Sequence, residues 1–363
     1  MTTADVIVVG GGPAGSTVAW RLARAGRRVV LCDAAAFPRV KLCAGWVTRA
    51  ALGDLELDPA TYPETIQPFS DVSVAVGART HETRWDRTAS YGIVRAEFDT
   101  FLLRRATAAG AVVHERTRVR TVRPVADGVV MESDGGSFHA AVAVGAGGYG
   151  CPVARALGDI SPTEQAVVTL ESETRVGSAR LRGLTRRHGT PELIAEPDFR
   201  GYGWYFTKGD FLNVGVGALG GLAIRRRLDR LLARLRADGR LPETVTLTPF
   251  RGHAYTVRRD RPRRVGGERF LLVGDAAGLA RDFSGEGIGP AVRSATLAAE
   301  ALLAGQLASY PERVEEAFGT PRTRLARLVG HLPHAIIVAF AQLVCTRPGL
   351  RRRVVLEGAF GIG

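Results

Sequence analysis

The chain begins with alternating apolar and polar blocks that predict a β-α-β unit. Residues 6–9 (VIVV) form a continuous apolar run, which is typical of a strand buried on both faces. A glycine-rich turn, GGGPAG, follows at 10–15, and apolar residues then recur at helical spacing as far as Ala23. A second apolar run at 28–32 (RVVLC) ends in Asp33. We therefore expect strand, turn, helix and strand at the start of the chain.

Later segments predict a second, β-rich region and a helical end. We expect a helix over 98–106, followed by a meander of strands with DG and GG turns up to about residue 148. Strand-like alternation then fills 160–255, interrupted by an amphipathic helix at 222–239. The segment 290–360 is predicted to be helical.

Composition narrows the class of protein. The 363 residues are 45% hydrophobic and 23% charged and include 44 glycines, which is typical of an α/β globular chain. The net charge is +13, but its local concentrations (225–227, 258–264 and 351–353) carry no interleaved aromatic residues. We expect no nucleic-acid partner and keep an anionic membrane surface or a phosphorylated substrate as a hypothesis.

The cysteines and the apolar runs indicate the compartment. The four cysteines are far apart with no CxxC pair, so we expect neither a disulfide framework nor a metal site. The N-terminus has no basic region before its first strand, so we expect no signal peptide. The apolar run 335–345 has 11 residues, too few to span a bilayer. We expect a cytoplasmic protein, with peripheral membrane contact as a hypothesis.

The glycine turn indicates a dinucleotide site. Gly10 permits a tight turn, Gly12 lets the backbone approach a pyrophosphate, and Gly15 lets the helix pack closely on the strand. Asp33 lies 18 residues after Gly15, where a carboxylate can accept hydrogen bonds from ribose hydroxyls. An ordinary glycine turn is the alternative, and the register of strand, turn, helix, strand and acid argues against it.

A second signature far along the chain suggests which dinucleotide binds. In FLLVGDAAGLARDFSGEGIGPAVRSA, at 270–295, a predicted strand runs into Gly274 and Asp275, and a glycine-opened helix follows. This segment resembles the GD motif of FAD-dependent enzymes of the para-hydroxybenzoate hydroxylase fold, whose Asp holds the ribityl chain. A helix N-cap is the alternative for Asp275. The resemblance implies one FAD bound by both ends of a discontinuous domain.

The predicted fold class is α/β, α+β overall: a discontinuous Rossmann-like FAD-binding domain with an inserted, mainly antiparallel substrate domain and a helical C-terminal region. We place the FAD-binding domain at 1–70, 90–158 and 265–300, the substrate domain at 71–89 and 159–264, and the helical region at 301–363.

Three segments narrow the resemblance further: RVKLCAG at 39–45, YGWYF at 202–206, and the block from GDAAG to GEGIG. Together they resemble the geranylgeranyl reductase family, flavoproteins with RxKxCGG beside the flavin and PxxYxWxFP in the substrate cavity. Ala44 replaces a motif glycine, and Phe199 and Thr207 replace the two motif prolines. The segment VGAGG at 144–148 also lacks the Asp of the related GADG motif.

The resemblance implies the following site residues. The predicted cofactor-binding residues are Gly10, Gly12, Pro13, Ala14, Gly15, Asp33, Ala34, Arg39, Lys41, Cys43, Ala44, Arg95, Val119, Gly274, Asp275, Gly285, Gly287 and Ile288. The predicted catalytic or substrate-lining residues are Cys43, Tyr202, Trp204, Phe206 and His253. The alternative for Cys43 is a small buried apolar residue, and the alternative for the three rings is core packing. Cys43, Tyr202 and His253 are the candidate proton donors.

The two lysines of the chain both lie near these motifs. Lys41 belongs to the RxKxC pattern, where a compact ammonium and a planar guanidinium differ in reach and geometry. Lys208 only flanks the aromatic segment. We therefore expect a role for Lys41 in the loop on the flavin side.

The expected activity is FAD-dependent reduction of a carbon-carbon double bond in an isoprenoid-like or other apolar substrate. The electron donor is expected to bind transiently, either NAD(P)H or a small redox protein. The alternatives are a flavin monooxygenase or dehydrogenase of a natural-product pathway and, in another class, a non-catalytic prenyl-binding carrier. The WxWxIP pattern of flavin halogenases is missing.

Overall fold

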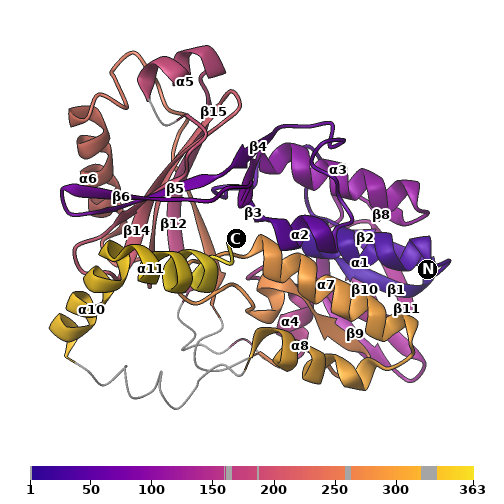
Figure 1. The fold of residues 1–363 in the computed structure, drawn as a ribbon. Coiled ribbons are helices and arrows are strands. Elements are labelled where there is room, and N and C mark those ends of the chain that lie inside the picture. The colour runs from indigo at the N-terminus through magenta and orange to yellow at the C-terminus, as the bar shows by residue number, and fades with distance from the viewer. Residues whose placement is uncertain (1, 159, 161–165, 186–187, 258–262, 320–332) are drawn as a thin grey trace.

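The computed structural model describes residues 2–158, 160, 166–185, 188–257, 263–319 and 333–363. Figure 1 shows two lobes, with the N-terminal strands and α7 in one lobe and β12, β14 and β15 in the other. The predicted boundary at 159, most of the basic cluster 258–264 and part of the predicted helical end (320–332) lie outside the described residues.

The first lobe is built on a seven-stranded sheet of the described residues, in the order β8-β2-β1-β11-β10-β9, with β17 also pairing β11. Its strands are β1 (Thr2–Val9), β2 (Val29–Cys32), β8 (Val112–His114), β9 (Val119–Val125), β10 (Gly128–Ser133), β11 (Gly136–Gly145) and β17 (Phe270–Leu272). The pairs β1–β2, β2–β8, β1–β11 and β11–β17 are parallel. Such a sheet must be covered on both faces, which explains the continuous apolar runs.

Helices α1 (Pro13–Arg24), α3 (Arg95–Ala108) and α7 (Ile288–Leu303) pack together on this sheet, α1 against both others (Figure 1). The predicted β-α-β unit and the helix at 98–106 are confirmed. Short helices complete the lobe: α2 (Arg49–Asp54), α4 (Pro152–Ala156) and the 3₁₀ turn η1 (Gly274–Ala277).

The second lobe contains another seven-stranded sheet of the described residues, in the order β16-β12-β15-β14-β13-β5-β6. Its strands are β5 (Asp71–Val76), β6 (Arg79–Arg84), β12 (Ala166–Arg175), β13 (Glu192–Ala195), β14 (Gly201–Lys208), β15 (Phe211–Leu219) and β16 (Arg251–Thr256). Only the pair β5–β13 is parallel among the described pairs of this sheet. Strands from 71–84 thus join strands from 166–256.

The two faces of this second sheet differ. Tyr205, Val214 and Val216 face a hydrophobic cluster with α6 (Ile224–Ala237), the predicted amphipathic helix, and α5 (Ser178–Leu184) lies on the same side. On the opposite face, Trp204 and Phe206 pack with Phe360 and neighbouring apolar residues of the C-terminal segment. Because side chains alternate along a strand, this opposite face carries Tyr202, Trp204 and Phe206 together.

A three-stranded sheet joins the lobes in the order β3-β7-β4. It consists of β3 (Trp46–Thr48), β4 (Ile66–Phe69) and β7 (Ser90–Ile93). The chain passes from β4 into β5 of the second lobe and returns from β6 into β7. The three-stranded sheet therefore contains the strands on either side of this excursion.

The described part of the C-terminal region is mainly helical. It comprises η2 (Leu307–Ser309), α8 (Tyr310–Phe318), α10 (His334–Thr346), α11 (Pro348–Leu350) and the π-helix η3 (Arg351–Ala359). Arg351, buried, donates hydrogen bonds to Thr83 Oγ1 and to the Glu82 carbonyl, which holds this segment against β6. In the described part of the chain, no helix is long and apolar enough to cross a membrane.

Lys208, which the sequence placed only beside a motif, is fully buried at the end of β14. Its ammonium donates to the Ala44 carbonyl at 2.9 Å and to the Ile93 carbonyl at 2.6 Å, and it forms an ion pair with Glu173 Oε2 at 2.6 Å. An ammonium has three N–H donors, and here each has an acceptor. Lys208 therefore links β14 and β12 of the second lobe to β7 and to the loop before β3.

We expect Lys208→Met to lower the free energy of unfolding by about 3–5 kcal/mol, because it leaves two carbonyls and the half-buried Glu173 carboxylate without their buried cation. Urea unfolding followed by circular dichroism measures this. The matched control is Arg84→Met, which removes an exposed partner of Asp71 and should cost less than about 1 kcal/mol. Equal losses in the two variants would contradict the role given to Lys208.

Candidate active site

The two glycine-rich signatures, far apart in sequence, meet at the amino ends of α1 and α7. A Cβ atom on Gly274 would lie 3.1 Å from Ala291 Cβ in α7 and 3.3 Å from Ala14 Cβ in α1. The Gly274 N–H donates to Ser294 Oγ of α7 at 2.9 Å. The predicted residues Pro13, Ala14, Ile288 and their neighbours therefore form one site, at the carboxyl ends of β1 and β17.

The turn at 10–15 leaves room only for glycine at the closest approach of strand and helix. A Cβ on Gly15 would lie 1.8 Å from the Gly10 carbonyl oxygen, so even alanine is excluded. At Gly12, the N-cap of α1, a Cβ would meet only Arg39 Nη2, at 3.3 Å. The backbone at Gly12 is thus open on the side that faces Arg39, as phosphate binding at a helix N-terminus requires.

Asp33 closes the other side of the turn. Its carboxylate accepts the Gly11 N–H at 2.6 Å and the Ala35 N–H at 2.8 Å. Each oxygen accepts one backbone hydrogen bond and has further acceptor capacity for hydroxyl groups. Ala34 is exposed beside it. Val119 is different, because its side chain is buried in the core of the first lobe.

Two arginines share one buried aspartate beside the turn. Arg95, the first residue of α3, binds Asp99 through two hydrogen bonds of 2.7 and 2.8 Å, and Arg39 Nη2 lies 3.2 Å from Asp99 Oδ2. Asp99 is fully buried, so its charge is compensated from both sides. Arg39 Nε is buried and has no hydrogen-bond partner among the described residues. Asp99 was not predicted, although its i, i+4 spacing to Arg95 on a helix was a signal.

These observations fit FAD. The glycine cradle, the hydroxyl-binding carboxylate of Asp33, the unpartnered buried nitrogen of Arg39 and the α7 N-terminus match the phosphate, ribose and ring parts of that cofactor. Asp275 Oδ1 would lie 3.3 Å from a Cβ on Gly287, the N-cap of α7. Burial raises the pKa of Asp275. A hydroxyl-rich chain is a suitable partner for such a group, because it can donate to the carboxylate.

The loop on the proposed flavin side carries Lys41 and Cys43. The Lys41 ammonium lies 2.8 Å from His253 Nε2 in β16, so this loop contacts the second sheet. Burial lowers the pKa of Lys41 to about 8, and burial together with the charge of Lys41 lowers the pKa of His253 to about 3. His253 is therefore neutral near pH 7 and accepts a hydrogen bond instead of supplying a proton. Burial raises the pKa of the Cys43 thiol.

The departure at Ala44 has a physical reason. The backbone φ angle of Ala44 is not positive, so alanine fits there without strain, whereas Gly45 has a φ of +68°. A Cβ on Gly45 would lie 2.1 Å from the Ile93 carbonyl oxygen and 2.4 Å from Lys208 Nζ. The second glycine of the motif is thus required here, and the first position contributes its carbonyl, which any residue provides.

The aromatic segment of β14, predicted to be one wall of the site, lies beside the loop with Cys43. Trp204 lies across Gly215 of β15, where a Cβ would come within 2.3 Å of the indole ring. Its Nε1–H donates to Asn213 Oδ1 at 2.7 Å, and Asn213 Nδ2 donates to the Cys43 carbonyl at 3.2 Å. Trp204 and Phe206 are buried in a hydrophobic cluster with residues of the C-terminal segment, as the packing alternative expects, and their substrate-lining role stays a prediction.

Tyrosines connect this wall to the loop before α7. The Tyr202 hydroxyl donates to the Ser284 carbonyl, and a Cβ on Gly285 would lie 1.8 Å from the Tyr255 hydroxyl. Burial raises the pKa of both tyrosines. Burial also raises the pKa of Glu286 to about 7, although its Oε1 accepts the Gly289 N–H. The predicted glycines 285 and 287 thus lie between the second sheet and α7.

Another residue beside the predicted site that the sequence did not reveal is Glu171 of β12. It is opposite Gly215 in the β12–β15 pair, and its Cβ lies 2.7 Å from where a Gly215 Cβ would be, beside Trp204. It is only 1% exposed, and burial raises its pKa to about 8. The sequence signal was weak, because a Glu in the alternating segment VVTLESETR is equally compatible with a solvent-facing position.

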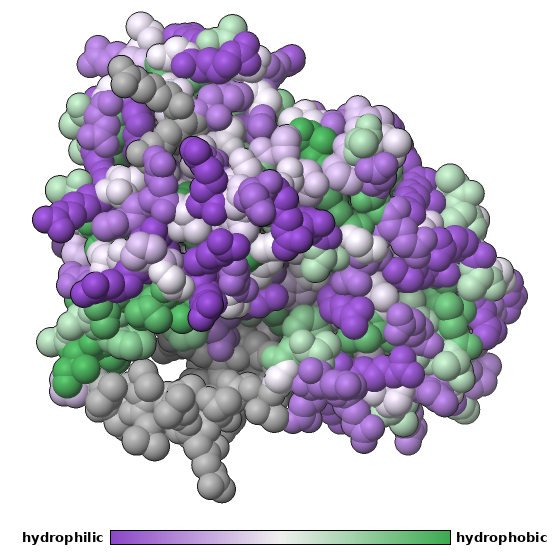
Figure 2. Space-filling view, viewed as in Figure 1, coloured by the Kyte–Doolittle hydropathy of each residue, from purple (hydrophilic) through white to green (hydrophobic). Residues whose placement is uncertain are grey.

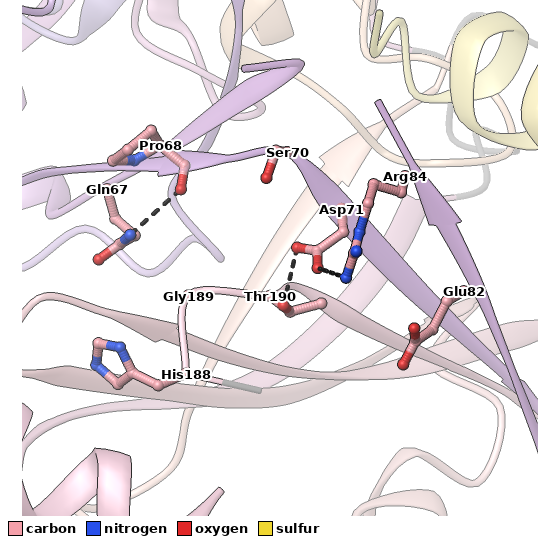
Figure 3. A pocket seen from close by; sticks show the side chains of 9 residues that line it. All are labelled: Gln67, Pro68, Ser70, Asp71, Glu82, Arg84, His188, Gly189 and Thr190. Atoms are coloured by element: carbon pink, nitrogen blue, oxygen red, sulfur yellow. Dashed lines mark hydrogen bonds and ion pairs between the residues drawn. The ribbon is translucent and has the colours of Figure 1, made fainter. Parts of the chain in front are cut away.

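An open polar hollow of about 530 Å³ lies elsewhere, between β4, β5, β6 and the segment 188–190. Figure 3 shows Asp71 there, accepting a hydrogen bond from Thr190 and paired with Arg84. None of its lining residues belongs to the glycine cradle or the aromatic wall. Asp71, Thr190 and Arg84 bind one another there, and Gln67 and His188 bind backbone carbonyls.

Comparison with known proteins agrees with this geometry. A family model described as FAD binding domain matches residues 3–309. The menaquinone reductase of Mycolicibacterium smegmatis is 30% identical over 348 residues, covering 85% of this chain and 78% of that protein. Digeranylgeranylglycerophospholipid reductase 1 of Methanopyrus kandleri is 30% identical over 340 residues, covering 86% of each chain.

A crystal structure with the same fold is that of a geranylgeranyl bacteriochlorophyll reductase-like protein from Thermoplasma acidophilum. It matches with a TM-score of 0.80 at 19% identity and covers 99% of this chain and 97% of that one. The predicted fold class is thereby confirmed.

The raised pKa of Glu171 makes stability depend on pH. Between 4.5 and about 8 the folded protein holds a proton on Glu171 that the unfolded chain releases, so this group's contribution to the free energy of unfolding falls as pH rises. The slope is at most about 1.4 kcal/mol per pH unit. Urea unfolding of wild type and Glu171→Gln from pH 5 to 8 isolates this contribution as their difference. A difference that does not change with pH would contradict the raised pKa.

Proposed function

This chain belongs to the geranylgeranyl reductase family of FAD-dependent oxidoreductases, and we propose that it reduces a carbon-carbon double bond of an isoprenoid-like or other apolar substrate. The observation that carries the proposal is the row of aromatic side chains Tyr202, Trp204 and Phe206 on one face of the second sheet. This row lies beside the loop with Cys43, to which Trp204 is linked through Asn213. Bound, reduced FAD supplies a hydride.

The protein's own residues supply binding, orientation and exclusion of water. Gly10, Gly12, Gly15, Asp33, Arg39 and the Gly274–Asp275 turn would hold the cofactor. The aromatic wall would align the apolar substrate, and the buried surroundings would keep water from the reacting atoms. Val40 and Phe283, both highly exposed, adjoin Lys41 and Ser284 in sequence, so apolar side chains stand at the edge of the site.

We propose that the substrate carries isoprenoid double bonds next to a head group that the fold does not specify. One relative's name specifies menaquinone and another's a digeranylgeranyl phospholipid. The aromatic side chains of β14 would contact a hydrocarbon chain, and the few polar groups beside them would contact its head group. Such a combination is typical of sites for largely apolar ligands.

We propose that the electron donor, NAD(P)H or a small redox protein, binds transiently. The described residues contain one glycine turn of the dinucleotide type, and that turn belongs to FAD. Stopped-flow bleaching of the flavin absorbance with NADH, NADPH and a reduced ferredoxin tests the donors in turn. Failure of all three to bleach the flavin would overturn this part of the proposal.

The proposed reaction predicts that dithionite-reduced holoenzyme, mixed anaerobically with menaquinone or a digeranylgeranyl phospholipid, forms products heavier by H2. Mass spectrometry after reoxidation of any quinol to the quinone in air detects them, because only the reduced double bond then keeps the added H2. Trp204→Phe should lower kcat/KM about tenfold or more, because it removes ring area and the indole N–H bonded to Asn213. Trp20→Phe, at a buried position of α1 in the first lobe, is the matched control with little effect.

Two outcomes would contradict the reductase proposal. An oxygenated product formed in air, with no saturated product without oxygen, would favour the monooxygenase. A purified protein that binds no FAD would favour the prenyl-binding carrier.

We also propose peripheral contact with an anionic membrane surface through α10. Its exposed Ile336, Phe340 and Leu343 follow an i, i+4, i+7 pattern, and the exposed Arg352 and Arg353 lie close by in the chain. Figure 2 shows hydrophobic residues gathered at the lower left, where Figure 1 places α10. Apolar side chains beside arginines are typical of interfacial helices.

This membrane contact predicts co-sedimentation with phosphatidylglycerol vesicles at low salt. Replacing Ile336 and Phe340 by Ser should weaken vesicle binding at least tenfold, because about 1.5–3 kcal/mol of apolar burial is lost per side chain. Val112→Ser, an exposed position in the other lobe, is the control. Failure of the wild type to sediment with the vesicles at low salt would refute the contact.

A further inference from the structure

Glu171 occupies an unusual position in the site. It is only 1% exposed, lies beside the Trp204 ring, and its Oε1 has no hydrogen-bond partner in the part of the chain that the structure describes. A buried carboxyl oxygen without a partner is costly unless the group is neutral or has a ligand to bind. The position therefore calls for an explanation beyond packing.

The neighbouring charges show what surrounds Glu171. Its negative charge contributes to the raised pKa of Cys43, Tyr202 and Tyr255, so the carboxyl lies among these groups of the site. Glu173, two residues along the same strand face, is ion-paired with Lys208 at 2.6 Å. Burial raises the pKa of Glu171 to about 8, which keeps it protonated at neutral pH. The Lys208 charge opposes this rise, the Glu173 charge adds to it, and the charges of Arg95 and Lys41 oppose it more weakly.

The other candidate donors are occupied or hold their protons more tightly. The Tyr202 hydroxyl donates to the Ser284 carbonyl, and the Lys41 ammonium lies against His253. His253 carries no extra proton near pH 7 because of its lowered pKa, and the raised pKa of Cys43 makes its thiol a weaker acid than a carboxyl group. Glu171 combines a protonated carboxyl with an oxygen that has no partner.

We propose that Glu171 is the proton donor of the double-bond reduction: a buried acid without a partner, on the sheet face that holds the substrate wall. This inference rests on the proposed function. The π bond of the substrate breaks, the hydride that the reduced cofactor supplies forms a C–H bond at one carbon, and the Glu171 O–H breaks to place its proton on the other. The electron pair of that O–H stays on Glu171 as carboxylate, which regains a proton from water after product release.

The first arm of the test is spectroscopic and needs no turnover. Infrared difference spectra of FAD-loaded enzyme are taken between pH 6 and higher pH values. They should show the C=O band of a buried protonated carboxyl at pH 6, and this band should disappear as pH rises through about 8. Glu171→Gln should remove this band, and Glu171→Asp should retain a shifted one. A wild-type spectrum whose band is unchanged in Glu171→Gln would overturn the inference.

The second arm measures single-turnover reduction of the double bond by anaerobically reduced enzyme. Glu171→Gln should lower the rate about 10²–10⁴-fold with little change in substrate KM, and Glu171→Asp should restore part of it. The wild-type rate should fall as pH rises through about 8, and the variant's should not. Glu56→Gln, which alters the ion pairs of an exposed carboxylate with Arg24 and Arg21, should behave as the wild type.

The outcomes separate the two proposals. A wild type that forms saturated product while Glu171→Gln is equally fast, with the same pH profile, overturns the role of Glu171 and leaves the proposed function standing. A wild type that forms no saturated product with any tested substrate overturns both. Loss of rate in Glu171→Gln together with loss of the infrared band supports the proton donor.

Discussion

The arrangement of the site depends on one buried ammonium. Lys208 is fully enclosed, and its three N–H donors bind the carbonyls of Ala44 and Ile93 and the carboxylate of Glu173. A charge in such a place is stable only where all its partners are present, so these four elements have one arrangement relative to one another. That arrangement brings the loop with Cys43 against the aromatic strand and the strand with Glu171. Arginine, which the chain uses almost everywhere else, has no room here, since Gly45 already lies against the ammonium.

Around Lys208, pairs of neighbouring ionisable side chains differ in whether they are charged. Lys41 and His253 form a contact in which the lysine holds the proton, and on the neighbouring strand Glu173 is ion-paired while Glu171 is neutral. Groups whose surroundings drive their pKa values apart are the usual basis of acid and base roles in one site. The second sheet therefore does more than enclose an apolar substrate, because it also sets which groups carry protons beside it.

The sequence predicted those features that depend on local pattern. The β-α-β unit, the GD turn, the helix after GEGIG and the shared face of Tyr202, Trp204 and Phe206 all follow from spacing within a short segment. The features it missed depend on partners far along the chain. Lys208 binds carbonyls 164 and 115 residues away, and Glu171 acquires its character from burial against a strand whose register no local pattern gives. The backbone angles explain why Ala44 can replace a motif glycine, because the positive φ occurs at Gly45 and not at Ala44.

The parallel sheet of the first lobe also bears on how the protein is made. Strand β1 pairs with β11, 136 residues later, and β11 pairs in turn with β17, which follows all the strands of the second lobe. Pairing over such separations closes long loops and is slow. During synthesis the glycine turn at 10–15 leaves the ribosome early, whereas Gly274 and α7, which complete the same site, emerge only near the end. Strand β11 therefore keeps part of one edge unpaired until β17 arrives, and the cofactor site is complete only after Gly274 and α7 have emerged.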